Sequence, residues 1–84
     1  MSENVRATFI RRPELMQITG LSSSAIDRRI EKGLLVPPVN LGGRAVAWVS
    51  YEVDAVMNAF IAEKSADEIR DLIDSLLRDR QIAA

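Results

Sequence analysis

The segment LMQITGLSSSAIDRRIEKGLL, residues 15–35, constrains the fold most, because it has the pattern of two short helices joined by a glycine turn. Pro13 suits the first position of the first helix, where the N–H that proline lacks has no partner anyway, and Leu15 and Ile18 are expected to form its apolar stripe. Gly20 interrupts that helix, and Ser22 suits the N-cap of a second one, expected over residues 23–32. The sequence therefore predicts a helix-turn-helix unit.

The expected second helix has one apolar and one polar face. At about 100° per residue, Ile26 and Ile30 point toward the core together. The opposite face, flanked by Ala25 and Asp27, holds Ser24, Arg28, Glu31 and Lys32. In helix-turn-helix proteins the second helix offers such a face to the major groove of DNA, with its N-terminal residues nearest the base edges. This face is the first candidate for a functional surface.

A small β-hairpin is expected after these helices. Pro37 and Pro38 favour an extended backbone, and the following VNLGGRAVAWV alternates apolar residues around Gly42 and Gly43. A glycine pair tolerates the positive φ angles of a tight hairpin turn. A hairpin placed directly after a helix-turn-helix unit is called a wing. Trp48 is expected to be a core residue of this wing.

Two more helices are expected toward the C-terminus. Ser50 is placed as the cap of a third helix, whose apolar stripe consists of Val53, Val56, Met57, Phe60 and Ile61. Ser65 and Glu68 have the spacing of a capping box, which favours a fourth helix from about Ala66 to Gln81. The alternative is one helix that runs straight through both segments.

The composition excludes several kinds of chemistry. The 84 residues suffice for one small domain, and 48% of them are hydrophobic, as in a globular chain. The absence of Cys and His removes disulfides, the usual zinc and iron sites and histidine-based acid–base catalysis. No cofactor and no metal is expected. No apolar run reaches the ~20 residues of a membrane span, and MSENVRATF lacks the core of a secretory signal. A cytoplasmic protein is the expectation.

The net charge of −1 hides an uneven distribution. Residues 1–47 carry seven basic and four acidic side chains, a balance of +3. Residues 48–84 carry four basic and eight acidic side chains, a balance of −4. Phosphate binding depends on the charge of the face that meets the nucleic acid, not on the total. The net charge therefore does not exclude DNA as a ligand.

The chain resembles the AlpA family of phage and mobile-element regulators from about Ile10 to Ile61. The segments that carry the resemblance are RPELMQITGLS, SAIDRRIEKG, VPPVNLGGRAVAW and SYEVDAVMNAFI, in that order. Members of the family are small winged helix-turn-helix proteins, related in shape to MerR-type domains and excisionases. They act as transcription regulators or as recombination directionality factors that bend DNA for excision. The family usually ends near Ile61, so the last residues of this chain are an addition.

The resemblance implies a set of DNA-binding residues. It places Ser23, Ser24, Asp27 and Arg28 toward the major groove, and it places Arg44 of the wing toward the minor groove or its phosphates. Family members often have a basic residue at the position of Ser23 and an aromatic one at that of Asp27, so both departures weaken the attraction of one subunit for DNA.

Each of these assignments has a plainer alternative. Arg28 could contact guanine or phosphate, or it could be a solvated helix residue. Lys32 and Ser24 are candidate phosphate contacts, although such residues occur on any helix surface. Arg44 could instead keep the hairpin tip soluble, and Asp27 could be a solubilising charge or pair within its own helix. A solvated pair of arginines is one interpretation of Arg11 and Arg12, and contact with the DNA backbone is the other.

The fourth helix raises the question of quaternary structure. Its apolar stripe consists of Ile69, Leu72, Ile73, Leu76 and Leu77. We expect this stripe to mediate oligomerisation by packing on a second subunit, because family members manage without the segment. The alternative is that the helix folds back on its own domain and enlarges the core.

The sequence therefore predicts a mostly α fold with a small β-hairpin, a winged helix-turn-helix domain plus an extra C-terminal helix. The expected parts are a flexible arm (1–8), the DNA-binding domain (9–62) and the C-terminal amphipathic helix (63–84). The expected function is sequence-specific binding of double-stranded DNA without catalysis, as a transcription regulator or an excisionase. An integrase or RNA polymerase is a candidate partner. The alternative is a protein-interaction module with a decayed DNA face, which docks a partner through the C-terminal helix.

Overall fold

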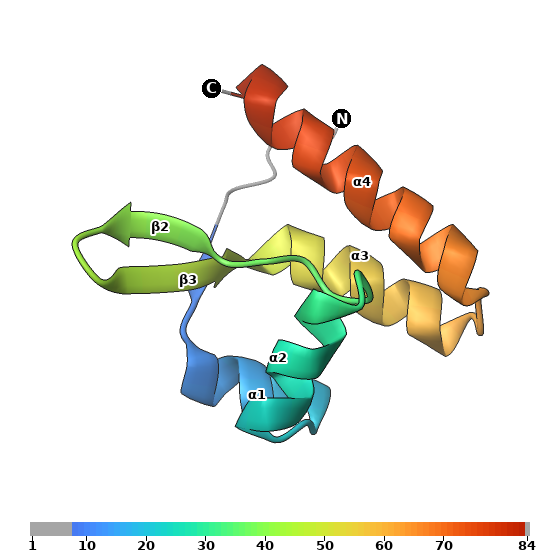
Figure 1. Cartoon of the computed structure of the whole chain (residues 1–84), viewed down its shortest axis with the longest axis horizontal. Helices are drawn as coiled ribbons and strands as arrows, with labels where there is room; N and C mark the ends of the chain where they lie inside the picture. Colours follow the sequence, from blue (N-terminus) through green and yellow to red (C-terminus); the bar gives the residue numbers. More distant parts are fainter. Residues whose placement is uncertain (1–7, 84) are drawn as a thin grey trace.

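The structure, a computed structural model, describes residues 8–83. The elements follow one another along the chain in the order β1 (Phe9–Ile10), α1 (Arg12–Thr19), α2 (Ser23–Glu31), β2 (Val39–Gly42), β3 (Ala45–Val49), α3 (Ser50–Ile61) and α4 (Ala66–Ala83). Figure 1 shows the β2–β3 hairpin projecting from one side of the helices, with α4 lying across the other. The predicted fold class is confirmed. The expected arm lies outside the described residues except for Thr8.

The helix-turn-helix unit forms as predicted. The hydroxyl of Ser22 accepts a hydrogen bond from the backbone N–H of Ala25 at 3.2 Å, which confirms it as the N-cap of α2. Leu15 of α1 and Ile26 of α2 are completely buried and face each other's helix across the core. Ile18 was expected beside Leu15, but it is 40% exposed because the short α1 presents only a narrow face to the core.

The sheet has one strand more than the sequence indicated. Its order is β1-β3-β2 with antiparallel pairs, and Ile10 of β1 lies opposite Trp48 of β3. A two-residue strand is too short to show an alternating pattern, so β1 left no signal. Ser50 was expected to be the N-cap of α3, but Val49 holds that position. The Ser50 hydroxyl accepts instead from the N–H of Thr8 at 3.3 Å, which extends the β1 pairing.

Helix α3 follows β3 directly and ends before α4 begins, so one continuous helix is excluded. Val53 and Val56 are fully buried, and Met57 and Phe60 are partly buried against the core. Ile61, the last member of the expected stripe, is 76% exposed, because it lies at the end of α3 where no other element covers it.

Helix α4 begins with the predicted capping box. The hydroxyl of Ser65 accepts from the N–H of Glu68 at 3.1 Å, and the Glu68 carboxylate accepts from the N–H of Ser65 at 2.9 Å. The helix folds back on its own domain, the alternative that the sequence left open. Ile69 and Ile73 are almost completely buried in the common core of the chain itself, and their part in an interface between copies stays a prediction. The partly buried Leu72, Leu76 and Leu77 pack against the same core.

Trp48 connects the wing to the rest of the core. Its ring is completely buried, which confirms the prediction for this residue, and its indole N–H donates to the carbonyl of Val36 at 3.0 Å. No helix within residues 8–83 is long and apolar enough to cross a membrane.

Candidate nucleic-acid interface

The polar face of α2 lies on the surface of the molecule. Ser24, Arg28 and Lys32 are all exposed and follow one another at intervals of four residues, which places them along one side of the helix. Ile26 lies on the other side and is completely buried, while Ile30 is partly buried. The core therefore fixes which side of α2 faces outward, as the sequence pattern predicted.

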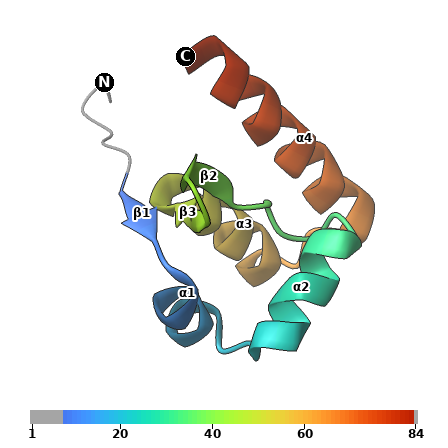
Figure 2. The ribbon, with the colours of Figure 1, turned by 60° about the vertical axis from the view of Figure 1, so that its left-hand side comes forward.

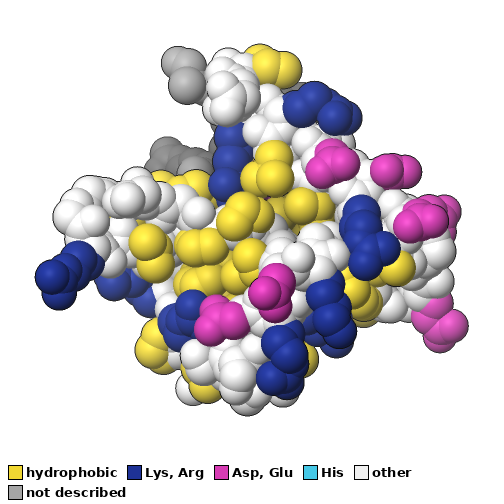
Figure 3. All heavy atoms as spheres, viewed as in Figure 1, with side chains coloured by type: hydrophobic (Ala, Val, Ile, Leu, Met, Phe, Trp, Pro, Cys, Tyr) yellow, Lys and Arg dark blue, Asp and Glu magenta, His cyan; other side chains and the backbone are white. Residues whose placement is uncertain are grey.

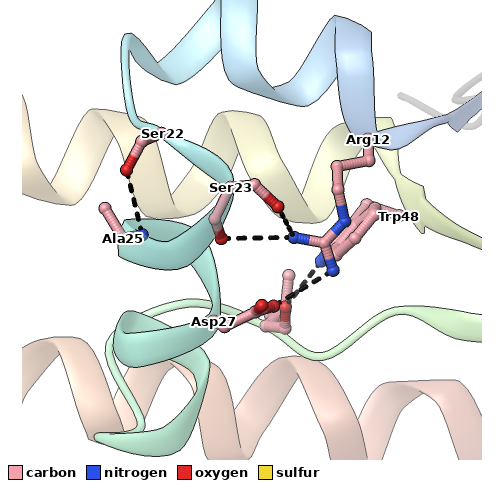
Figure 4. Close-up of polar contacts among 7 residues, drawn as sticks. Arg12, Ser22, Ser23, Ala25, Asp27 and Trp48 are labelled. Atoms are coloured by element: carbon pink, nitrogen blue, oxygen red, sulfur yellow. Dashed lines mark hydrogen bonds and ion pairs between the residues drawn. The ribbon is translucent and has the colours of Figure 1, made fainter.

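Two residues at the beginning of α2 bind an arginine of α1. One guanidinium nitrogen of Arg12 donates to the hydroxyl of Ser23 at 3.0 Å and to its carbonyl at 3.3 Å. The other nitrogen donates to a carboxylate oxygen of Asp27 at 3.0 Å. Figure 4 shows the Arg12 side chain reaching across to both residues of α2. Ser23 and Asp27 therefore have an internal role that the sequence analysis missed, and base contact by either stays a prediction.

Arg12 also joins α2 to the sheet. Its guanidinium carbon lies 5.3 Å from the centre of the buried Trp48 ring, a distance at which a cation is attracted to the aromatic face. Arg12 is only partly exposed, so the solvated pair of arginines proposed for positions 11 and 12 is wrong for this residue. The side chain has instead a fixed place where α1, α2 and β3 meet (Figure 4).

The wing is built as the glycine pair predicted. Gly42 and Gly43 have φ angles of 113° and 58°, and the Asn40 carboxamide oxygen accepts from the N–H of Gly42 at 2.7 Å. This turn leaves Arg44 exposed at the tip of the hairpin, next to the beginning of β3. In Figure 1 the tip is the part of the hairpin farthest from the helices.

The charges divide the surface. Figure 3 shows Asp and Glu side chains gathered over α4, while Lys and Arg side chains predominate around the helix-turn-helix unit and at the tip of the wing. Three ion pairs occur within residues 8–83: Arg12–Asp27, Arg70–Asp67 and Arg80–Glu52. None includes Arg28, Lys32 or Arg44, so these cations have no carboxylate partner in the part of the chain that the structure describes. They are available to an anionic ligand.

The remaining surface of residues 8–83 has apolar hollows but no group of metal ligands. In the described range no three acidic, histidine or cysteine side chains are grouped so that they could hold a metal ion. The hollow beside α2 is lined mainly by apolar side chains, among them Leu21, Leu34, Met57 and Phe60. Arg29 of α2 lies over the Phe60 ring at 4.7 Å from its centre, so this arginine contacts the protein's own surface.

The sequence did not predict the contacts of two further arginines. Arg70 and Arg80, both on α4, bind residues that precede them by tens of positions. Arg80 pairs with Glu52, which lies in the first turn of α3. No local pattern connects such residues. The one available signal was that Arg70 and Arg80 fall on the same side of α4 as the apolar stripe.

The helix-turn-helix unit, the glycine-tipped wing and their unpaired cations together define a winged helix-turn-helix protein. The chain belongs to the AlpA family: its residues 8–60 match the family model described as "Prophage CP4-57 regulatory protein (AlpA)". The family is regulatory rather than enzymatic. The expected resemblance is thereby confirmed.

A phage protein is among the relatives. "Uncharacterized protein ORF88" of Enterobacteria phage P4 is 50% identical over 54 residues, which are 64% of this chain. The match spans 61% of the length of the phage protein, so more than a third of that protein lies outside it. No solved structure gave a significant match. The family match stops at residue 60, so α4 lies outside it.

Proposed function

We propose that the protein binds duplex DNA as a regulator of a phage or another mobile element. In this proposal α2 enters the major groove and the wing contacts an adjacent minor groove. Arg28 reads guanine or binds a phosphate, Ser24 and Lys32 bind phosphates, and Arg44 reaches the minor groove or its backbone. Base contacts by Ser23 and Asp27 are secondary, because Arg12 already occupies both side chains.

The observation that carries the proposal is the set of unpaired cations on two projecting elements. Arg28, Lys32 and Arg44 are exposed, and none has an ion-pair partner among the residues described. Eight of the twelve acidic side chains belong to residues 48–84, and five of these eight lie on α4. Because Arg12 offsets the charge of Asp27, the face of α2 is less acidic than its sequence suggests. This answers the objection raised by the net charge.

The experiment is a fluorescence-anisotropy titration with a duplex from around the protein's own gene and an unrelated duplex of equal length. Arg28→Ala and Arg44→Ala should each weaken specific binding by about 1–3 kcal/mol. Arg78→Ala is the matched control, because Arg78 is an exposed cation on α4. Added salt should weaken binding steeply. Unchanged affinity in both Arg28→Ala and Arg44→Ala would remove the proposed DNA face.

The proposal includes two roles on DNA. An excisionase would coat several adjacent sites cooperatively, whereas a transcription regulator would bind one palindromic site near a promoter. Footprinting on DNA around the gene separates the two patterns. An integrase for the first role and RNA polymerase for the second are the corresponding candidate partners.

The alternative of a partner-docking module is weakened by the position of α4. Such a module needs a free apolar stripe, but Ile69 and Ile73 lie inside the chain's own core. Self-association through the remaining half-exposed members, Leu72, Leu76 and Leu77, stays a prediction that sedimentation equilibrium would test. A salt-independent complex with a protein, in the absence of DNA binding, would restore this alternative.

A further inference from the structure

Helix α4 lies along the segment that joins the recognition helix α2 to the wing. We call this segment, residues 32–38, the α2–wing linker. Arg70, Ile73, Leu77 and Arg80 recur at intervals of three, four and three residues, so they share one side of α4. Arg70, Ile73 and Leu77 line one shallow surface hollow together with Gly33, Leu35 and Pro37 of the linker. Figure 2 shows the end of α2 beside the first turns of α4.

Arg70 holds the beginning of the linker. Its Nε donates to the carbonyl of Lys32, the C-cap of α2, at 2.9 Å. Its side-chain carbons run past Gly33, where a Cβ would lie 3.6 Å from Cγ of Arg70. A cation at this place also meets the negative end of the α2 dipole. Arg70 therefore fixes the position where the recognition helix ends.

Arg80 holds the other end of the α2–wing linker. One guanidinium nitrogen donates to the carbonyl of Pro37 at 2.8 Å, directly before the residues that lead into β2. Two more hydrogen bonds, of 2.6 and 2.9 Å, join the guanidinium to the carboxylate of Glu52. Glu52 is 1% exposed and sits on α3, so it holds Arg80 from the side of the core.

The middle of the linker is fixed by burial and by the wing. Leu35 and Val36 are 3% and 0% exposed, and the carbonyl of Val36 accepts the indole N–H of Trp48 in β3. Helix α4 thus holds both ends of the linker, because the carbonyls of Lys32 and Pro37 bind two arginines that lie ten residues apart on α4.

We propose that α4 is an internal brace, which sets the spacing and angle between α2 and the wing. Arg70 and Arg80 are then positioning residues: they touch no DNA, but they hold two DNA-binding elements in the geometry in which both engage one duplex. This last step rests on the proposed function, while the brace itself does not. The inference assigns a role to the segment that the family match leaves out.

The brace is tested first without DNA. Because the chain has no cysteine, Ser24→Cys on α2 and Val46→Cys on β3 provide two labelling sites, both exposed. The distance distribution between spin labels at these two sites is recorded in three proteins. The first carries only the two cysteines, the second also carries Arg70→Met, and the third carries Arg78→Met instead. Met keeps the length of the side chain, and Arg78 makes no hydrogen bond within the described residues. We expect a broader distribution with Arg70→Met only. Equal widths in all three proteins would overturn the brace.

The positioning role is tested next with two duplexes, one from around the gene and one unrelated. Arg70→Met should lower the ratio of specific to non-specific affinity about fivefold or more, whereas Arg78→Met should leave it unchanged. A variant that is merely less stable would lose both affinities by the same factor, so the ratio separates positioning from destabilisation. Arg70→Lys, which keeps a cationic donor, should restore much of the ratio.

The outcomes are distinguishable. A broadened distribution with an unchanged ratio would overturn the positioning role. If the unaltered protein binds neither duplex, the proposed function fails, and the distance distributions alone decide whether α4 is a brace. A double variant, Glu52→Met with Arg80→Met, repeats both measurements at the other end of the linker without leaving a buried charge unpaired.

Discussion

Arg80 and Glu52 form a bidentate ion pair between α4 and α3, with hydrogen bonds of 2.6 and 2.9 Å to the two carboxylate oxygens. The Glu52 side chain is 1% exposed and that of Arg80 is 23% exposed, so the pair is largely withdrawn from water. A carboxylate at this depth requires a partner, because an unpaired buried charge costs several kcal/mol. α4 is therefore part of the folded domain.

Arg80→Met should destabilise the protein by about 3–5 kcal/mol, because it leaves the Glu52 carboxylate buried and unpaired. A domain of this size has a total stability of about 5–15 kcal/mol, so partial unfolding at room temperature is within reach. Urea unfolding followed by circular dichroism measures the change.

The double variant Glu52→Met/Arg80→Met is the decisive comparison for this ion pair. It removes both charges, so it should be clearly more stable than Arg80→Met alone. Arg78→Met, an exposed change on the same helix, should stay within about 0.5 kcal/mol of the unaltered chain. A double variant as unstable as Arg80→Met would show that the loss came from packing and not from the stranded charge.

The turn between α3 and α4 offers a stabilising substitution. Glu63 has a φ angle of 56°, a left-handed conformation that costs a residue with a Cβ about 1 kcal/mol. Glu63→Gly should therefore raise the free energy of unfolding by up to about 1 kcal/mol, and Glu63→Ala should leave it nearly unchanged. Equal stability of the glycine and alanine variants would mean that the turn carries no strain.

Gly33 is the matched position at the end of α2. Its φ angle is 76°, so Gly33→Ala should lower the free energy of unfolding by about 1 kcal/mol. An added Cβ would meet the Arg70 side chain only at ordinary contact distance, so the backbone conformation sets the cost. In the same unfolding assay, Glu63→Gly should thus raise the free energy of unfolding and Gly33→Ala should lower it.

The capping box of α4 makes stability depend on pH. Hydrogen bonding with the backbone and then with the side chain of Ser65, together with the charge of Lys64, lowers the pKa of Glu68 below its usual value, while burial acts in the opposite direction. A depressed folded-state pKa adds stability that is present above the unfolded pKa and is lost as pH falls through the folded one. The loss attributable to Glu68 should therefore begin near pH 4.5 and increase on further acidification.

Glu68→Gln tests this assignment, because glutamine still accepts from the N–H of Ser65 but does not titrate. Urea unfolding between pH 7 and pH 3 should show the unaltered chain converging toward the variant as pH falls. A constant difference between the two across this range would assign the pH dependence to other carboxylates.

The parts of the fold that the sequence predicted are those encoded within about four residues. Ser22 caps α2, Ser65 and Glu68 form their box, and the glycine pair closes the wing, because each device depends on near neighbours. Helical periodicity likewise indicated the buried face of α2. The errors at Ile18 and Ile61 lie at helix ends, where periodicity cannot tell whether another element covers the surface.

The parts that the sequence did not predict depend on contacts between distant residues. Arg12 and Asp27 are 15 positions apart, Glu52 and Arg80 are 28 apart, and Lys32 and Arg70 are 38 apart. Each arginine looked like an ordinary surface cation because its partner lies on another element. The same holds for β1, which exists only because Phe9 and Ile10 meet β3. The sequence thus predicted which face of α2 points outward, but it did not predict that Arg12 offsets the charge of Asp27 on that helix.

The ion pair between Arg12 and Asp27 leads to a prediction about DNA affinity. Asp27 lies on α2 with its side chain 62% exposed, and Arg12 reaches only one of its oxygens. Asp27→Asn keeps an acceptor for Arg12 but removes a negative charge from the face proposed to meet phosphates. Affinity for duplex DNA should therefore rise about threefold at low salt, and the gain should shrink as salt screens the removed repulsion.

Two comparisons make this prediction specific to the α2 face. Asp71→Asn removes the same charge from an exposed position on α4, so it should change DNA affinity little. Arg12→Met leaves Asp27 unpaired and frees Ser23, so it should weaken binding where Asp27→Asn strengthens it. Anisotropy titrations of the three variants at two salt concentrations measure these differences. If Asp27→Asn and Asp71→Asn raise affinity equally, net charge governs binding, and α2 is not the surface that meets DNA.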